Sequence, residues 1–241
     1  MRYHTVGRTN TDVQRVDRRA EIVAMPDGAW PVTGRTERRV AVDLWIDPIC
    51  PWCLIGMTQM ERAAAALGVA LDLRLRAFRL HPIWPADGMD WRQFQAHRDL
   101  PDAVFDRVAE AGWTHGLDFR FSEIARVPDT TDMHRLLIAA GPGQARALYV
   151  AFSDAYFFRR ENLADPAILR GAAARGGLSR TQFDAALSDP TTLSRLTGDE
   201  AEARAMGVTG VPFLRLGQAR LSGAQGEGGY ARLLGQVLAS R

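Results

Sequence analysis

Most of the information about the fold of this chain lies in one stretch, Val40-Ala41-Val42-Asp43-Leu44-Trp45-Ile46-Asp47-Pro48-Ile49-Cys50-Pro51-Trp52-Cys53. Its first seven residues form an apolar, β-rich run that Asp47-Pro48 ends, which is typical of a buried strand. A helical pattern follows as far as the alanine run 63–66, and Gly68 stands where the end of a helix favours a positive φ. Residues Ala70–Phe78 alternate with period two and predict a second strand. Strand, helix and strand together predict a βαβ unit.

The rest of the chain is predicted to be a long helical block and then a short β-rich end. The predicted helices are Trp91–Arg98, Ala103–Ala111, Thr131–Ala140, Gln144–Phe158, Pro166–Arg175, Thr181–Leu187 and Thr192–Met206. After Gly207 the pattern changes, and Pro212–Leu216 with Ala219–Leu221 predict a hairpin around Gly217-Gln218. A closing helix is predicted from Gln225 to Ala239.

These patterns predict an α/β fold of the order βαβ…ββα that is interrupted by a helical insertion. We divide the chain into an N-terminal extension (1–39), which we expect to be weakly ordered, an α/β domain (40–79 and 207–241) and an inserted helical domain (80–206). The length of 241 residues and the hydrophobic fraction of 46% suit one large domain or two small ones with a sizeable core.

Composition excludes several classes of protein. No run reaches the ~18 uninterrupted apolar residues of a membrane-spanning helix, and the first thirty residues contain no apolar core of a signal peptide. All 30 basic residues are arginine, and their excess lies in residues 1–39, which hold 8 Arg against 5 acidic residues. The remainder holds 22 Arg against 23 acidic residues and has no overall basic character. We therefore expect a cytoplasmic protein that binds neither nucleic acid nor membrane.

Cys50 and Cys53 are the only cysteines, and they lie where the first strand gives way to a helix. As a structural disulfide the pair would add little, roughly 2 kcal/mol, because the loop is so short. As half of a zinc site it lacks partners, since the five histidines (4, 81, 97, 115 and 134) are scattered, so no metal is predicted. A redox-active dithiol fits best, because a CxxC motif beside a βαβ pattern is typical of thioredoxin-like proteins.

The position at a helix N-terminus suggests a division of roles between the two thiols. Free backbone N–H groups and the helix dipole favour the thiolate of Cys50, which we expect to be an exposed nucleophile. Cys53, one turn further in, would resolve the mixed disulfide. Pro51 suits the first turn of a helix, and Trp52 supplies apolar surface beside the sulfur. We predict both of these residues to contact the substrate.

The second candidate motif is Gly207-Val208-Thr209-Gly210-Val211-Pro212-Phe213. We expect a cis bond between Val211 and Pro212, although only about 5–6% of such bonds are cis in folded proteins. This geometry would present backbone groups of Val211 beside the dithiol, so Val211 and Pro212 complete the predicted substrate-binding residues.

Five short motifs, in this order and spacing, carry a family resemblance: Asp47-Pro48-Ile49-Cys50-Pro51-Trp52-Cys53 with Gly56, Phe78-Arg79-Leu80-His81-Pro82, His134-Arg135-Leu136, Gly207–Phe213 and Ser222-Gly223-Ala224-Gln225. On these motifs the stretch Val40–Ala239 resembles the DsbA-like thioredoxin-fold proteins, and within them the intracellular FrnE-like group. The resemblance implies a thioredoxin-like fold with a large inserted all-helical domain, and thiol–disulfide exchange at the cysteine pair. Some FrnE-like members carry a further cysteine motif, which this chain lacks.

Kappa-class glutathione transferases and 2-hydroxychromene-2-carboxylate isomerases resemble the chain in fold and provide the alternative. They generally carry serine at the position of Cys50 and use glutathione, which they hold with an Asp-Arg pair where this chain has Ala224-Gln225. Ser222 and Gln225 are therefore a candidate glutathione or anion site at a helix N-terminus. The simpler interpretation, which we favour, is that both residues cap that helix.

Other candidate residues have simpler explanations. Trp84, Trp91, Trp113, Phe119 and Phe121 are expected to be packing residues rather than the lining of a groove. His134 is expected to be an interior histidine with its hydrogen bonds satisfied. Gly141-Pro142-Gly143-Gln144 lacks the Lys-Ser/Thr of a phosphate-binding loop.

Three functional hypotheses remain. The first is a dithiol oxidoreductase that acts on protein or small-thiol disulfides with no cofactor beyond its own redox-active disulfide, and with glutathione as a candidate co-substrate. The second is a glutathione-dependent isomerase or transferase. The third is a non-catalytic binding or chaperone-like module with idle cysteines. Either a monomer or a homodimer is compatible with the sequence.

Overall fold

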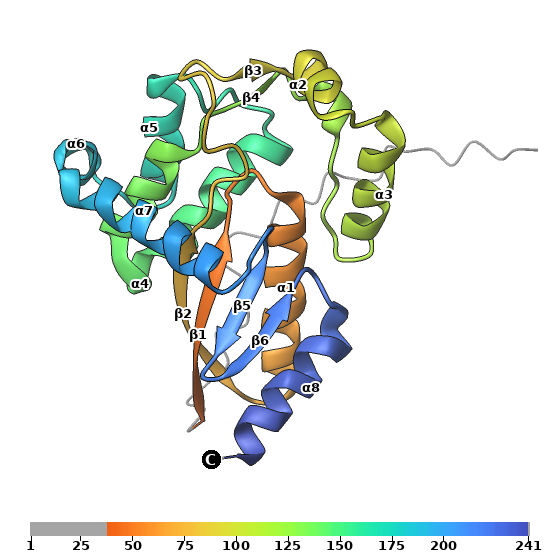
Figure 1. Cartoon of the computed structure of the whole chain (residues 1–241). Helices are drawn as coiled ribbons and strands as arrows, with labels where there is room; N and C mark the ends of the chain where they lie inside the picture. The colour runs from red at the N-terminus through yellow and green to blue at the C-terminus, as the bar shows by residue number, and fades with distance from the viewer. Residues whose placement is uncertain (1–37, 241) are drawn as a thin grey trace, which may run out of the picture. The chain divides into compact units, whose positions relative to one another are not determined.

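Four strands form the sheet on which the candidate site is built. In the computed structural model, which describes residues 38–240, β1 (Arg39–Ile46) runs parallel to β2 (Ala70–Ala77) over its whole length. On its other side β1 pairs antiparallel with β5 (Phe213–Leu216), which forms a hairpin with β6 (Ala219–Ser222). The strand order β2-β1-β5-β6 confirms the predicted βαβ…ββα arrangement (Figure 1). The predicted extension lies outside the described residues up to residue 37.

Helices make up most of the rest of the described residues. They are α1 (Pro51–Ala66), α2 (Trp91–Arg98), α3 (Asp102–Trp113), α4 (Thr131–Ser153), α5 (Pro166–Arg175), α6 (Arg180–Ser188), α7 (Pro190–Ala205) and α8 (Gly226–Ala239), with a short 3-10 turn η1 (Phe121–Glu123) and a π-helical turn η2 (Asp154–Phe158). Helices α1 and α8 contact each other, whereas α4 and α7 contact the edge strand β2. In Figure 1 the inserted helices α4–α7 lie on the opposite side of the sheet from α8. Residues 38–240 belong to one compact unit.

The inserted block differs from the prediction in one detail. It is not purely helical, because β3 (Met89–Asp90) pairs antiparallel with β4 (Arg126–Val127). Strands of two residues are too short to show an alternating pattern, so the sequence gives no sign of them. The predicted break between the helices Thr131–Ala140 and Gln144–Phe158 is confirmed, because Gly141 is non-helical within α4, whose second half continues into η2.

A glycine and a proline produce the kink in α4. Gly141 has φ 67° and ψ 175°, a conformation that favours glycine, and Pro142 has no N–H to donate to the preceding turn. The helix therefore stops and restarts without a connecting loop.

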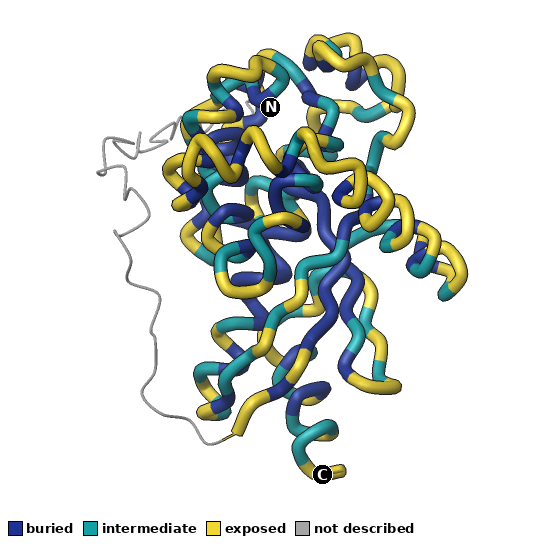
Figure 2. Tube along the Cα trace, turned by 90° about the vertical axis from the view of Figure 1, so that its left-hand side faces the viewer, coloured by how far each residue is buried: buried dark blue, intermediate teal, exposed yellow. Residues whose placement is uncertain are grey.

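The core continues from the sheet into the inserted block. In β1 the side chains of Val40, Val42, Leu44 and Ile46 are at most 1% exposed, and Figure 2 shows buried residues along the central strands. In the inserted block the predicted packing residues Trp91, Phe119 and Phe121 are buried and in ring contact with Phe94, Phe105, Phe157 and Phe158. Trp113 is the exception, since it is 68% exposed. Within residues 38–240 no helix combines the length and apolarity needed to cross a membrane.

Candidate active site

The end of β1 and the start of α1 hold the two cysteines. After Ile46 the chain turns, and the Cys50 N–H donates a hydrogen bond to the carbonyl oxygen of Asp47 at 3.0 Å. Cys50 is the N-cap residue of α1, with an extended backbone, and Pro51 occupies the first helical position. The Cys53 N–H donates to the Cys50 carbonyl at 3.0 Å. Both thiols therefore lie in or beside the first turn of α1, as the sequence predicts.

The expectation that Cys50 is exposed is wrong. Its side chain is 4% exposed, and that of Cys53 is fully buried. The reason is the direction of the Cys50 thiol, whose Sγ lies 3.6 Å from the carbonyl oxygen of Val211 and donates a hydrogen bond to it. Both cysteines are free thiols.

The loop before β5 forms the wall opposite Cys50. The Val211–Pro212 peptide bond is cis. The Pro212 carbonyl accepts a hydrogen bond from the Gly223 N–H at 2.7 Å, so this loop is tied to the segment before α8. Val211 is half-buried and Pro212 is buried. Hence three of the four predicted substrate-binding residues, Pro51, Val211 and Pro212, are at least partly buried.

Trp52 is the exposed apolar surface of the candidate site. Its side chain is 39% exposed, whereas the cysteines on either side of it are buried. A partner that approaches this turn of α1 would meet the indole ring, and the contact of Trp52 with substrate stays a prediction.

The surroundings of Cys53 oppose its ionisation. Burial is the main cause that raises the pKa of the Cys53 thiol well above its usual range, and the hydrogen bond to Cys50 and the charges of Cys50 and Asp47 act in the same direction. A backbone hydrogen bond from Asp47 acts against them. Cys53 is thus held as a protonated thiol until something draws its proton away.

Asp47 is a part of the site that the sequence analysis did not single out. Its carboxyl group is fully buried at the end of β1, where it accepts a hydrogen bond from the Leu80 N–H at 2.7 Å. Weaker contacts come from the Ile49 N–H and the Thr130 hydroxyl, both at 3.4 Å. Burial raises the pKa of Asp47 to about 7, although these hydrogen bonds oppose the shift. The available signal was the position of this aspartate, three residues before a CxxC motif.

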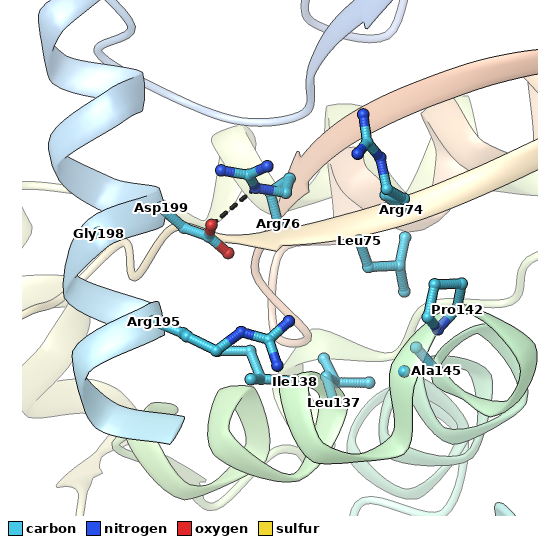
Figure 3. A pocket seen from close by; sticks show the side chains of 11 residues that line it. Arg74, Leu75, Arg76, Leu137, Ile138, Pro142, Ala145, Arg195, Gly198 and Asp199 are labelled. Carbon is cyan, nitrogen blue, oxygen red and sulfur yellow. Dashed lines mark ion pairs between the residues drawn. The ribbon is translucent and has the colours of Figure 1, made fainter. Parts of the chain in front are cut away.

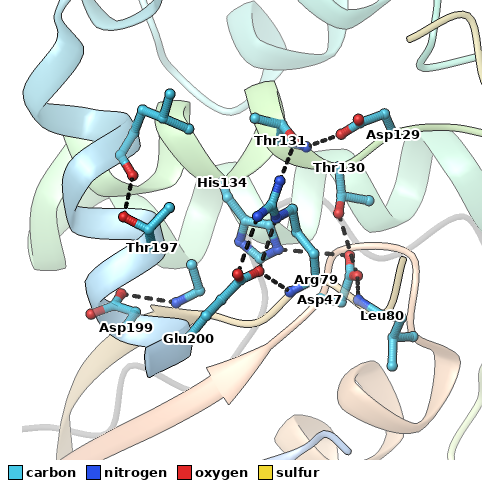
Figure 4. Close-up of polar contacts among 12 residues, drawn as sticks. Asp47, Arg79, Leu80, Asp129, Thr130, Thr131, His134, Thr197, Asp199 and Glu200 are labelled. Atoms are coloured by element: carbon cyan, nitrogen blue, oxygen red, sulfur yellow. Dashed lines mark hydrogen bonds and ion pairs between the residues drawn. The ribbon is translucent and has the colours of Figure 1, made fainter. Parts of the chain in front are cut away.

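His134 of α4 faces Asp47 in the interior (Figure 4). Its Nε2 lies 3.8 Å from Asp47 Oδ1, and burial lowers the pKa of His134 to about 3. The prediction of a satisfied interior histidine is wrong in one respect, because Nε2 has no hydrogen-bond partner among the described residues. The reason is that 3.8 Å is too long for a hydrogen bond.

A buried ion pair connects this region to the inserted block. Arg79, just after β2, donates from Nε to Glu200 Oε1 at 2.8 Å and from Nη1 to the Thr131 hydroxyl at 3.1 Å. Its backbone N–H also donates to Glu200, at 3.1 Å. Figure 4 shows Arg79 between Glu200 of α7 and the start of α4, next to His134.

The expectation that Ser222 and Gln225 cap α8 is wrong, whereas their role as an anion site stays a prediction. Both residues are exposed, and the Gln225 amide donates to the Ser222 carbonyl at 2.6 Å instead of capping α8. The capping acceptor comes from α1, where Gln59 Oε1 accepts a hydrogen bond from the Gly226 N–H at 2.9 Å. Gln59 also contacts His115 of the inserted block at 2.9 Å. Sequence gave no sign of these contacts, since they join distant segments.

We compared the sequence and structure of the chain with those of known proteins. The family model described as DSBA-like thioredoxin domain matches residues 41–235. A probable DsbA oxidoreductase from Streptomyces coelicolor is 30% identical, with a TM-score of 0.75, and the match covers 84% of this chain and 91% of that one. No curated protein matches the chain.

Two more distant structures share the fold. A cytosolic disulfide reductase, DsbM, from Pseudomonas aeruginosa is 19% identical with a TM-score of 0.58, over 84% of this chain and all of that one. A 2-hydroxychromene-2-carboxylate isomerase is 17% identical with a TM-score of 0.61, over 83% of this chain and 97% of that one.

Proposed function

The chain belongs to the DsbA-like thioredoxin family, and from that premise we propose that it is a thiol–disulfide oxidoreductase whose redox centre is Cys50 and Cys53. The observation that carries the proposal is the pair of free thiols at the start of α1, with the Cys50 sulfur directed at the Val211 carbonyl. The likeness to the isomerase supports the fold alone. The finer assignment to the FrnE-like group rests on the motif around Cys-Pro-Trp-Cys, and we retain it as part of the proposal.

The exchange proceeds in two balanced steps when the protein acts as a reductant. The Cys50 thiolate attacks one sulfur of a substrate disulfide, a mixed disulfide forms, and the other substrate sulfur leaves as a thiolate. Cys53 then loses its proton and attacks the Cys50 sulfur, which releases the second substrate thiolate. Two electrons pass from the cysteine pair to the substrate, and the pair becomes a disulfide. The reverse sequence oxidises a substrate dithiol.

Asp47 is suited to take the proton that Cys53 must lose. Its charge acts on the Cys53 thiol, and both groups are fully buried. A carboxyl group with a pKa of about 7 exists in both protonation states near neutral pH. We assign Asp47 as the proton acceptor in the second step.

Glutathione is the small-thiol partner that we propose to test first. A structure of the P. aeruginosa DsbM contains GSH, and Cys50 offers a sulfur with which glutathione disulfide would exchange. We also propose a cytoplasmic location, in keeping with the description of DsbM as cytosolic.

A thiol-trapping experiment tests the proposal. Reduced protein is incubated in glutathione buffers of graded potential, alkylated and analysed by mass spectrometry. We expect a reversible loss of both alkylation sites in the wild type, a stable glutathione adduct at Cys50 in Cys53→Ser, and no adduct in Cys50→Ser. Ser194→Ala, which removes an exposed hydroxyl from α7, is the matched control and should behave as wild type. Exchange that survives Cys50→Ser would overturn the proposal, whereas wild-type partner binding by the double serine variant, together with no disulfide in the wild type, would favour a binding module.

A further inference from the structure

A cavity of about 400 Å³ lies on the outer side of the edge strand β2, between β2, the kinked helix α4 and α7 (Figure 3). None of its lining residues belongs to the cysteine site. Its volume lies within the range of small-molecule sites in proteins, about 300–1,000 Å³. The proposed function gives this cavity no role.

The floor of the cavity is apolar, and the kink in α4 shapes it. Four residues make up this apolar floor: Leu137, Ile138, Pro142 and Ala145. Leu137 and Ile138 precede the break at Gly141, and Pro142 and Ala145 follow it. Gly141 itself also lines the cavity. A hydrophobic molecule would find complementary surface there.

The charges at the rim are unequal. Arg74 pairs with Asp43 at 2.8 Å, and Arg76 pairs with Asp199 at 2.7 Å and also with Glu202. Arg195 of α7 is exposed and, among residues 38–240, makes no ion pair or hydrogen bond. Its positive charge acts on Asp199, but Asp199 is already engaged by Arg76. Figure 3 shows the Arg195 side chain extended towards the apolar floor. The rim therefore offers one uncompensated cation.

The edge of β2 supplies a backbone donor beside that cation. The Ala77 N–H points away from the sheet and donates to Asp199 Oδ2 at 2.9 Å, whereas the next N–H, of Phe78, donates to Ile46 within the sheet at 3.1 Å. Backbone groups along a strand point alternately to its two sides. The N–H and C=O of Leu75 therefore point outwards like those of Ala77, and Leu75 lines the cavity. Because β2 is an edge strand, no neighbouring strand among the described residues pairs with its outer side. The Asp199 carboxylate takes that place at Ala77, and the cavity lies there at Leu75.

We propose that this cavity binds a small organic carboxylate with an apolar body. The carboxylate pairs with the Arg195 guanidinium and accepts a hydrogen bond from the Leu75 N–H, and the body lies on the apolar floor. A guanidinium and a backbone N–H are both donors that favour a carboxylate, and an apolar floor favours an aryl or branched alkyl group over acetate.

Titration calorimetry on the full chain with 4-methylbenzoate as the probe tests the proposal. Neutral 4-methylbenzamide and acetate, which lacks the apolar body, are the comparison ligands. We expect saturable binding of 4-methylbenzoate and at least about tenfold weaker binding of each comparison ligand, because one charge-assisted contact or the apolar contact is lost. In ¹⁵N-resolved NMR spectra the amide signal of Leu75 should shift with 4-methylbenzoate, while that of Cys50 should not.

Variants assign the binding to the cavity. Arg195→Gln should weaken the binding of 4-methylbenzoate by about tenfold, and Ala145→Leu, which fills the floor, should abolish it. Arg220→Gln removes an exposed arginine from β6, at the opposite edge of the sheet, and should leave binding unchanged. Because Arg195 is exposed, its variant stays folded even if Ala145→Leu does not. Absence of saturable binding, equal binding of the amide, or an unchanged affinity in Arg195→Gln would overturn the proposal.

Discussion

Cys50 and Cys53 have different surroundings although they are three residues apart. Cys50 ends an extended segment, so its thiol reaches the Val211 carbonyl and retains a small exposed area. Cys53 is inside the helix and fully buried, and its thiol is held in the protonated form. A reagent from solvent therefore reaches Cys50 first, and Cys53 can be activated only by groups within the protein. This inequality supports the proposed roles of Cys50 as the nucleophile and Cys53 as the resolving thiol.

Asp47 and His134 give opposite pH dependences to the free energy of unfolding. With its pKa raised to about 7, Asp47 keeps a proton in the folded state that the unfolded chain loses above about pH 4, so stability falls as the pH rises. With its pKa lowered to about 3, His134 lacks a proton that the unfolded chain keeps up to about pH 6.5, so stability rises with pH. Between about pH 4.5 and pH 6 the two effects cancel.

Substituting either residue removes its own effect, so the pH dependence of the free energy of unfolding that the other residue causes should become visible. In Asp47→Asn the free energy of unfolding should rise with pH more steeply than in the wild type, by about 1 kcal/mol per pH unit between about pH 4.5 and pH 6. In His134→Leu it should fall relative to the wild type by a similar slope. Urea unfolding at several pH values measures both slopes. Curves parallel to that of the wild type in both variants would contradict the assigned protonation states.

Trp52 is expected to contribute to substrate contact and little to stability. At 39% exposed it presents apolar surface next to Cys50. Trp52→Ala should lower kcat/KM for reduction of a protein disulfide by roughly tenfold, equivalent to about 1.4 kcal/mol, and leave the urea midpoint unchanged. Leu193→Ala, which removes a comparably exposed apolar side chain from α7, serves as the control. An equal loss of activity in both variants would argue against a specific role for Trp52.

Among the secondary-structure elements, those with a strong local pattern are the ones that sequence predicts well. The strand Val40–Ile46 and the hairpin around Gly217-Gln218 agree with the structure to within a residue or two at each end. The break within α4 also follows a local pattern, because Gly141-Pro142 indicates it and Gly141 has non-helical dihedral angles in the structure. The pair β3–β4 has no local pattern, because it depends on contact between segments 37 residues apart.

Gly56 allows α1 to approach the loop of Pro212 and helix α8. A Cβ at this position would lie 2.9 Å from the Tyr230 hydroxyl and 3.0 Å from Pro212 Cγ. Gly56→Ala should therefore lower the free energy of unfolding by about 1–3 kcal/mol through overpacking, and slow thiol exchange because Pro212 moves. Gly235→Ala in α8, where a Cβ meets nothing within 4 Å, should instead raise stability by about 0.5–1 kcal/mol. Chemical denaturation compares the two variants, and a stabilised Gly56→Ala would show that the close approach is absent.

At the scale of the whole molecule, the sequence predicts which residues react but not what surrounds them. The CxxC motif and Val211-Pro212 are recognisable because each is a short local motif, and the structure brings them into contact. Asp47, by contrast, acquires its properties from burial beneath the inserted block, where it meets His134 of α4. The residual exposure of Cys50 likewise depends on a loop 161 residues away. Such properties arise from tertiary packing, which a single sequence does not display.

The ion pair between Arg79 and Glu200 connects the α/β domain to the inserted helices. The two side chains are 14% and 3% exposed, and Arg204 also contacts Glu200 from the surface. Arg79→Ala leaves the Glu200 carboxylate buried with only a half-exposed partner, and it should lower the free energy of unfolding by about 3 kcal/mol. Arg120→Ala breaks an exposed pair with Asp118 and should cost at most about 1 kcal/mol. Equilibrium unfolding in urea at pH 7 measures both changes.

Because Arg79 also lies between α4 and α7, Arg79→Ala should increase amide hydrogen exchange around His134, whereas Arg120→Ala should not. Equal, small effects of the two substitutions would mean that apolar contacts alone hold the inserted block on the sheet.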